Sequence, residues 1–313
     1  MTLTGASGYV EIPHNAALNP TSAFTFEAWV SVTDANGVCS SIAGKGYSTA
    51  WWVGICGTTL RSYLQGGGSR RDGGTLDAGW NHIAITYDGT TRLHYINGEI
   101  VGTFPDTGPL TTNSSPVRIA SDVNWVYTPA GAMNEVRLWN VARTTGEIRG
   151  TINVPMTTAT PGLVAVWSLN ASGNDALATY SGTLNGATAF LTFPPSAGCA
   201  PTATSLCFEA RFSLIASWRA PDGSTGVGRV VPGASSNSGL FWFFSSDNWE
   251  LLVKELNGCA LNSRRWVFSA ATTNVQYRLT VLDQTRGAQK IYFNYQGLNA
   301  PAVTDTSAFA TCP

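Results

Sequence analysis

The chain has 313 residues, of which 43% are hydrophobic and only 12% are charged, and its formal net charge is -1. This length ordinarily divides into two domains, because single cores rarely grow beyond about 250 to 300 residues. The sequence has no Lys/Arg block to neutralise phosphates and no stretch near the roughly 18 apolar residues of a membrane span, so we expect no nucleic-acid partner and no membrane insertion.

The order of residue types predicts an all-β chain. Short runs rich in Val, Ile, Thr and aromatic residues alternate with Gly, Asn and Asp turns, as at residues 24–30, and no long helical period is present. The clearest pattern covers residues 80–101, where Asp88-Gly89 and Asn97-Gly98 separate three strand-like runs. Both dipeptides tolerate the positive φ angles of tight hairpin turns, so we predict a three-stranded meander.

A second hairpin is predicted at residues 39–56. Opposed residues in an antiparallel pair keep a constant sum of residue numbers, and the pair Cys39 with Cys56 has the same sum as Ala43 with Trp52. Cross-strand neighbours lie within disulfide range, so we predict a Cys39–Cys56 bridge, with residues 44–50 closing the loop.

A proline-bearing linker at residues 192–198 predicts two domains, residues 1–191 and 199–313. The second domain is bracketed by cysteines, and its alternating runs at 275–281 and 290–294 predict a smaller immunoglobulin-like antiparallel β-sandwich. Its four cysteines can pair in three ways. We favour Cys207 with Cys259 nested inside Cys199 with Cys312; the absence of any C-x-x-C pair disfavours zinc.

Eight short sequence motifs follow one another along the first half of the chain. They are GYVEIP at 8–13, FTFEAWV at 24–30, GWNHIA at 79–84, YDGT at 87–90, LHYING at 93–98, MNEVRLWN at 133–140, ART with EI at 142–148, and GLVAVW at 162–167. Over about residues 2–190 they resemble the laminin-G-like, concanavalin-A-like lectin-glucanase family. This resemblance implies a jelly-roll sandwich in a secreted or cell-surface protein, with a bacterial type suspected.

The C-terminal half resembles an uncharacterised Cys-bracketed domain of bacterial secreted proteins, which implies no activity. No signal segment follows Met1, so we expect that a signal peptide is not part of this sequence.

Alternation along the strands predicts the residues that fill the space between the two sheets of the first domain. They are Trp29, Ile83, Ile85, Leu93, Tyr95, Val136, Leu138 and Trp167. Residues 140–149 predict a short helical turn with Asn140 or Thr144 as its cap.

Enzymatic chemistry finds no support in the residue pattern. Glucanases of this fold place two acids two residues apart on one strand, and this chain has no such pair. A G-x-S-x-G elbow and an H-E-x-x-H motif are also missing. His82 and His94 lie on adjoining predicted strands and are expected to be ordinary sheet residues. We predict that the protein is not an enzyme.

The resemblance implies one candidate cofactor, a structural calcium ion. The family usually has Asp before the Glu-Val-Arg-Leu-Trp phrase, where it can ligate calcium together with main-chain oxygens near Gly8. Here that residue is Asn134, whose neutral amide would weaken the site. A second candidate is the loop with Asp122 and Asn124, for which the alternative is an Asx-type turn.

Sugar recognition usually needs exposed aromatic planes on scaffold loops. The candidates, in or beside Gly/Ser/Thr/Asn-rich loops, are Tyr47, Trp51, Trp52, Trp125 and Tyr127. Trp51 and Trp52 are adjacent, so one is expected in the core and the other at the surface. Partial burial under a loop is the alternative for each ring. Arg61, Arg70 and Arg71 could add charge for an acidic glycan.

We therefore predict a non-catalytic extracellular carbohydrate-binding or adhesion module whose partner is a polysaccharide or glycan. One alternative is a structural or protein-interaction subunit of an extracellular assembly or filament, with other extracellular proteins as partners and residues 241–244 hidden at a domain or subunit contact. A third is a polysaccharide-cleaving enzyme with an unfamiliar site.

Overall fold

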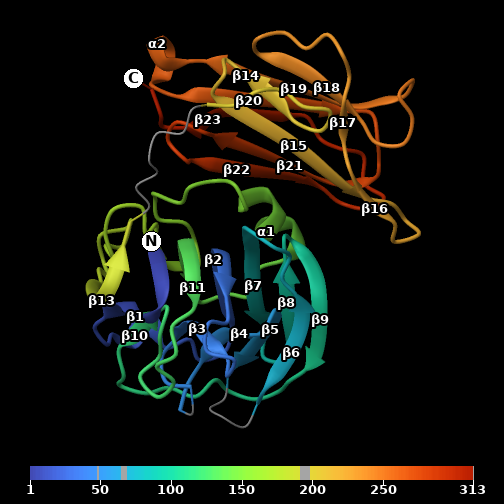
Figure 1. Cartoon of the computed structure of the whole chain (residues 1–313). Helices are drawn as coiled ribbons and strands as arrows, with labels where there is room; N and C mark the ends of the chain where they lie inside the picture. The colour runs from blue at the N-terminus through green and yellow to red at the C-terminus, as the bar shows by residue number, and fades with distance from the viewer. Residues whose placement is uncertain (48, 65–68, 191–197, 313) are drawn as a thin grey trace. The chain divides into compact units, whose positions relative to one another are not determined.

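The computed structural model describes residues 1–47, 49–64, 69–190 and 198–312. The chain forms two compact units, Met1–Leu191 and Thr192–Pro313 (Figure 1). Apart from Gly198, the predicted linker at 192–198 lies outside the described residues. Both units are built from antiparallel strands, which confirms the all-β prediction. Among the helices of the described ranges, none is long and apolar enough to cross a membrane.

The first unit contains the strands of a jelly-roll sandwich and two short helices. Its strands are β1 (Thr2–Ile12), β2 (Phe24–Thr33), β3 (Ser40–Gly44), β4 (Trp52–Cys56), β5 (Thr59–Tyr63), β6 (Arg71–Thr75), β7 (Asn81–Tyr87), β8 (Thr91–Ile96), β9 (Glu99–Pro105), β10 (Val117–Ile119), β11 (Ala130–Trp139), β12 (Leu163–Trp167) and β13 (Thr183–Ala189). Its helices are the 3-10 turn η1 (Ala16–Leu18) and α1 (Thr145–Thr151).

Strand β1 joins the two layers of this sandwich. The order β6-β5-β4-β3-β10-β1 forms one layer and β1-β11-β2-β7-β8-β9 the other. β1 belongs to both, because its first residues pair with β11 and its last residues pair with β10. The layers meet again where Gly73 of β6 lies against Gly102 and Phe104 of β9. Figure 1 shows β6 next to β8 and β9 at this closing edge.

The main core lies between these layers, with alternate residues of each strand facing it. Ile83, Ile85, Val136, Leu138 and Trp167 belong to it as predicted. The prediction was wrong for the other three residues, Trp29, Leu93 and Tyr95, which lie on the opposite face of their strands.

Helix α1 and its flanking segments cover that opposite face. Tyr95 packs with Ala84 and Ile148 in a separate cluster, with Leu93 beside it. The Trp29 indole donates to the Ile152 carbonyl. Alternation identifies the two faces of a strand, but a helix that covers the second face also buries apolar residues there.

The predicted meander is formed by β7, β8 and β9, with Asn97 and Gly98 both at positive φ in the turn. Thr144 caps α1: its hydroxyl accepts from the Glu147 amide, and the Glu147 carboxylate accepts from the Thr144 amide. This reciprocal capping fixes where the helix begins. Thr144 is one of the two caps predicted from the sequence.

The predicted hairpin at residues 39–56 is formed by β3 and β4. The Cys39–Cys56 disulfide is confirmed, with a Cα–Cα distance of 4.0 Å. The predicted pairing of Ala43 with Trp52 is wrong by one residue, because the register shifts between Ser41 and Ala43, so that Ala43 pairs with Val53. A β-bulge breaks the constant sum of residue numbers.

The second unit contains two antiparallel sheets and one short helix. Its elements are β14 (Leu206–Phe208), β15 (Phe212–Arg219), β16 (Thr225–Val227), β17 (Arg229–Val230), β18 (Ser238–Trp242), β19 (Trp249–Asn257), α2 (Cys259–Asn262), β20 (Arg265–Ala271), β21 (Gln276–Asp283), β22 (Gln289–Asn294) and β23 (Val303–Phe309). One sheet has the order β14-β15-β21-β22, with β16 beside β15, and the other has β17-β18-β19-β20-β23. Side chains from both sheets form one shared core, as in a β-sandwich.

The nested cysteine pairing predicted for this unit was wrong. The disulfides are Cys199–Cys207 and Cys259–Cys312. The first closes a short loop leading into β14. The second forms because β23 pairs with β20, which returns the chain end to α2. Pairing follows these local and sheet contacts rather than bracketing in the sequence.

The aromatic run at 241–244 alternates between two environments. Phe241 and Phe243 are buried in the unit's own core, whereas the side chain of Phe244 is 50% exposed. Phe241 and Phe243 are therefore not hidden at a domain or subunit contact, because they fill the sandwich to which they belong.

Candidate functional site

A group of aromatic rings gathers on the outer side of β3, β4 and β5. Tyr47 is at its centre, with ring centroids 4.7 Å from Tyr63, 5.2 Å from Trp125 and 5.9 Å from Trp52. Trp125 in turn lies 5.2 Å from Tyr127. Most of these pairs meet edge to face, a favourable arrangement for aromatic quadrupoles. The structure thus brings together four of the five aromatic residues proposed from the sequence.

The fifth, Trp51, is separate from this group. Its side chain is buried between the layers, 5.5 Å from Phe24 and 6.0 Å from Phe26. Trp52, the next residue, faces the opposite way, as predicted for neighbours on a strand. The expectation that one of the two is exposed was wrong, because loops cover Trp52 and leave it 1% exposed.

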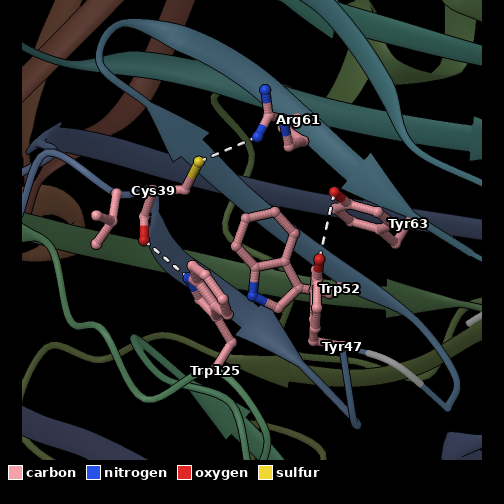
Figure 2. Close-up of a pocket in the computed structure, with 7 residues that line it drawn as sticks. Cys39, Tyr47, Trp52, Arg61, Tyr63 and Trp125 are labelled. Carbon is pink, nitrogen blue, oxygen red and sulfur yellow. Dashed lines mark hydrogen bonds between the residues drawn. The ribbon is translucent and has the colours of Figure 1, made fainter. Parts of the chain in front are cut away.

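The rings surround a shallow pocket of about 80 Å³, shown in Figure 2. Its lining residues are Val38, Cys39, Tyr47, Trp52, Arg61, Tyr63 and Trp125. Tyr47 and Trp125 are half-buried at the rim, whereas Trp52 and Tyr63 form a buried floor. The pocket is far smaller than the roughly 300–1,000 Å³ of sites for drug-sized ligands, so it suits one part of a larger ligand.

Hydrogen bonds hold Trp125 and Trp52 in fixed positions. The Trp125 indole donates to the Cys39 carbonyl over 2.9 Å (Figure 2). The Trp52 indole donates to the Ser41 hydroxyl over 2.8 Å, and that hydroxyl donates to the Trp125 carbonyl over 2.8 Å. The loop carrying Trp125 is therefore tied to β3 at its main chain and at its ring.

The loop that carries Tyr47 is fixed by the buried carboxylate of Asp122. Its oxygens accept from the amides of Gly46 at 2.7 Å, Tyr47 at 2.9 Å and Asn124 at 2.8 Å. On the other side, Asp34 accepts from the amides of Cys39 and Gly57, next to the disulfide. Both sides of the pocket are thus ordered before any ligand arrives, which lowers the entropy cost of binding.

Arg61 supplies the polar wall of the pocket. Asp72 holds it with two hydrogen bonds, from Nε to Oδ1 at 2.5 Å and from Nη2 to Oδ2 at 2.9 Å. The remaining nitrogen, Nη1, donates to Cys39 Sγ at 3.1 Å (Figure 2). Sulfur is a weak acceptor, so an oxygen atom of a ligand would be a better partner for this N–H group.

Asp72 also accepts from Arg70, at 3.0 Å from Nε and 2.5 Å from Nη2. Partial burial alone would raise the pKa of the Asp72 carboxyl, but the two arginines outweigh it and hold this pKa at about 2. Burial raises the pKa of Tyr63 to about 12, so its hydroxyl stays neutral. Arg71 lies outside this group and pairs with Asp106.

The side chains proposed for calcium are engaged in other contacts. Asp122 and Asn124 form an Asx-type turn, and the Asp122 oxygens accept main-chain amides as described above. Asn134 Oδ1 accepts from the Glu135 amide, and its Nδ2 donates to Asn170. Among the described residues, no group of three His, Cys, Asp or Glu side chains could hold a metal ion. The side-chain oxygens of Asp122 and Asn134 thus already accept main-chain amides, and calcium at either place stays a prediction.

We therefore expect the thermal unfolding midpoint to be the same with 2 mM calcium and with EDTA, and magnesium provides the matched control. An ion present at about one hundred times its Kd would add about 2.7 kcal/mol of stability. A rise of the midpoint with calcium but not with magnesium would show that the protein has a calcium site.

A serine and a histidine lie in contact elsewhere, but without access to solvent. Ser62 Oγ is 2.8 Å from His94 Nε2, and both residues are fully buried. Burial lowers the pKa of His94 to about 4, and Arg92 also donates to Ser62. A nucleophile must reach its substrate, so this contact is structural.

Three residues that line the pocket were not proposed from the sequence as ligand-binding residues: Val38, Cys39 and Tyr63. Tyr63 pairs with Trp52 across β4 and β5. The turn at Gly57, whose φ is +60°, was the signal that could have placed Tyr63 beside Trp52.

Comparisons with known proteins agree with this architecture. Residues 4–149 match the model of the concanavalin A-like lectin/glucanases superfamily. The first unit thus has the concanavalin A-like jelly-roll fold that the sequence resemblance implied. A search of curated proteins gave no match.

Three solved structures illustrate the likeness. A candidate carbohydrate binding protein from Bacteroides ovatus is 23% identical with a TM-score of 0.50, and the match covers 59% of each chain. Domain 4 of AbnA, a GH43 extracellular arabinanase from Geobacillus stearothermophilus in complex with arabinotriose, is 19% identical (TM-score 0.38; 47% of this chain, 73% of that one). The CBM40 of the Ruminococcus gnavus IT-sialidase, bound to alpha2,3 sialyllactose, is 13% identical (TM-score 0.38; 47% and 92%).

Proposed function

We propose that the first unit is a non-catalytic, extracellular carbohydrate-binding module and that the aromatic pocket is its glycan site. The observation that carries this proposal is the combination of half-buried aromatic rings, Tyr47 and Trp125, with the under-used N–H group of Arg61. The Bacteroides protein of similar fold is a candidate carbohydrate binding protein, which adds an analogy at the level of the fold.

A sugar can contact both the aromatic rings and the Arg61 N–H group of this pocket. The C–H face of a pyranose is apolar and packs against an aromatic ring, while its hydroxyls accept hydrogen bonds from groups such as Arg61 Nη1. A pocket of about 80 Å³ takes in one edge of a ring or a terminal residue, and the rest of the glycan would lie along the rim. Tyr127, 41% exposed next to Trp125, extends this rim.

An extracellular location is supported by the three disulfides, because such bridges persist in oxidising compartments. The non-catalytic assignment rests on the pocket's own lining, which holds Arg61 and no carboxylate. Hydrolysis of a glycosidic bond ordinarily needs two carboxyl groups flanking that bond.

A glycan array followed by calorimetry tests the proposal. Trp125→Ala is expected to weaken binding of the best glycan about tenfold, because aromatic anchors contribute the most to such sites. Trp249→Ala is the matched control, since Trp249 is 52% exposed in the second unit and should leave the affinity unchanged. A folded Trp125→Ala protein with wild-type affinity, or a wild-type protein that binds no glycan, would refute the proposed site.

A further inference from the structure

The ion-paired group of Arg61, Arg70 and Asp72 beside the pocket carries one net positive charge. Arg61 and Arg70 both form ion pairs with the same carboxylate, Asp72, which leaves one positive charge in excess. The side chain of Arg70 is 55% exposed, whereas that of Arg61 is 16% exposed. The chain as a whole has a formal charge of -1, so this local excess is not a general property of the protein.

This excess charge adjoins the aromatic pocket. Arg61 lines the pocket, and Arg70 is joined to it through Asp72, which accepts hydrogen bonds from both arginines. None of the pocket's lining residues is acidic. Asp34, in the segment just before Val38, does not line the pocket, and its carboxylate accepts hydrogen bonds from Asn36, Cys39, Ser40 and Gly57.

We propose that the glycan held by this pocket carries an anionic group, a carboxylate or a sulfate, at the position that meets Arg70 and the Nη1 group of Arg61. This inference rests on the proposed function and narrows its ligand class. Asp72 holds Arg61 with two hydrogen bonds, so the edge of its guanidinium that carries Nη1, which now donates only to the weak acceptor Cys39 Sγ, is presented to the pocket without further ordering. Arg70 adds a partly exposed charge that an anion can approach from solvent.

Two pairs of probes separate charge from sugar backbone. Oligogalacturonate and its methyl ester differ only in whether the carboxylate is free, and dextran sulfate and dextran differ in sulfation. We expect the anionic member of at least one pair to bind more tightly, and this preference to shrink between 50 and 300 mM salt, because screening acts on exposed charges. The pair that shows the preference identifies the anion as a carboxylate or a sulfate.

Variants at neighbouring positions give the matched test. Arg70→Gln is expected to weaken binding of the anionic probe about threefold and Arg70→Glu about tenfold, with little effect on the neutral probe. Arg71→Gln removes the same charge from the adjacent residue, which pairs with Asp106 instead, and should change the affinity less than twofold.

The outcomes distinguish the two proposals. Equal binding of charged and neutral probes, loss of affinity only in Arg71→Gln, or array hits confined to neutral glycans would overturn the anionic preference and leave glycan binding intact. Absence of binding to every glycan, charged or neutral, would overturn both.

Discussion

Glutamine in place of Glu27 is expected to lower the free energy of unfolding by about 3–5 kcal/mol, the usual cost of breaking a buried ion pair from one side. Glu27 lies on β2 beneath α1 and is fully buried. Its Oε1 accepts from Arg143 Nη1 at 2.5 Å, while its Oε2 is 3.4 Å from His82 Nε2 and 3.6 Å from Arg137 Nη1.

Arg143, the closest cation to Glu27, causes most of this expected loss. Burial alone would raise the pKa of the Glu27 carboxyl, but His82, Arg137 and Arg143 together lower it, so the group is ionised. Arg143 also donates to the Glu147 carbonyl and Arg137 to the Thr151 carbonyl, which ties α1 to the sheet. Neutralising Glu27 leaves the buried guanidinium of Arg143 without this counter-ion, while Arg137 keeps its ion pair with Glu135 at 3.1 Å.

Urea unfolding measures the effect. Each unit has its own core, so the curve is fitted with two transitions, and the variant should move only one of them. Glu99→Gln is the control, because Glu99 forms a partly exposed pair with Arg149 at 3.6 Å and should change stability by less than about 1 kcal/mol. A loss below about 1 kcal/mol for Glu27→Gln would contradict the account of this network.

Alanine in place of Trp52 is expected to cost about 3–5 kcal/mol, as for other fully buried aromatic side chains. The indole lies against Gly54, where an added Cβ would come within 2.2 Å of the ring. Tyr47 and Tyr63 cover it, and its N–H donates to the buried Ser41 hydroxyl. The substitution removes the pocket floor and leaves that hydroxyl without its donor.

Differential scanning calorimetry on the whole chain reports this change, with Trp249→Ala as the control. Trp249 is half exposed, so its replacement should cost less than about 1 kcal/mol. A Trp52→Ala protein as stable as the control would mean that the indole is not the packed floor described above. Because this variant damages the fold, binding tests belong to Trp125 and Arg70.

Local sequence signals were sufficient for much of the first unit. The Asp88-Gly89 and Asn97-Gly98 turns set the meander, and alternation placed Trp51 and Trp52 on opposite faces. The same signals could not say how deeply Trp52 is buried. That burial depends on how the ring of Tyr47 folds over it and on the loop with Trp125, which is distant in sequence. The burial of Glu27 under α1 is equally non-local.

The cysteines illustrate the same limit. Cys39 and Cys56 lie within one hairpin, so their residue numbers alone predicted the bridge. The bulge between Ser41 and Ala43 shifts the strand pairing only beyond the cysteines. Cys259 and Cys312 meet only because β23 pairs with β20, a contact between distant segments. For the candidate site, the sequence supplied three of the aromatic residues that line the pocket, Tyr47, Trp52 and Trp125, together with Arg61, but only the fold brought them together.

The indole N–H signals of the tryptophans in a ¹⁵N-labelled sample, assigned by Trp→Phe substitution, test glycan recognition at the aromatic pocket most directly. Titration with the best glycan should shift the Trp125 and Trp52 signals in proportion to occupancy, while the signal of Trp249 in the second unit stays in place. Shifts confined to Trp249, or a saturating glycan that leaves the Trp125 signal unmoved, would contradict the account.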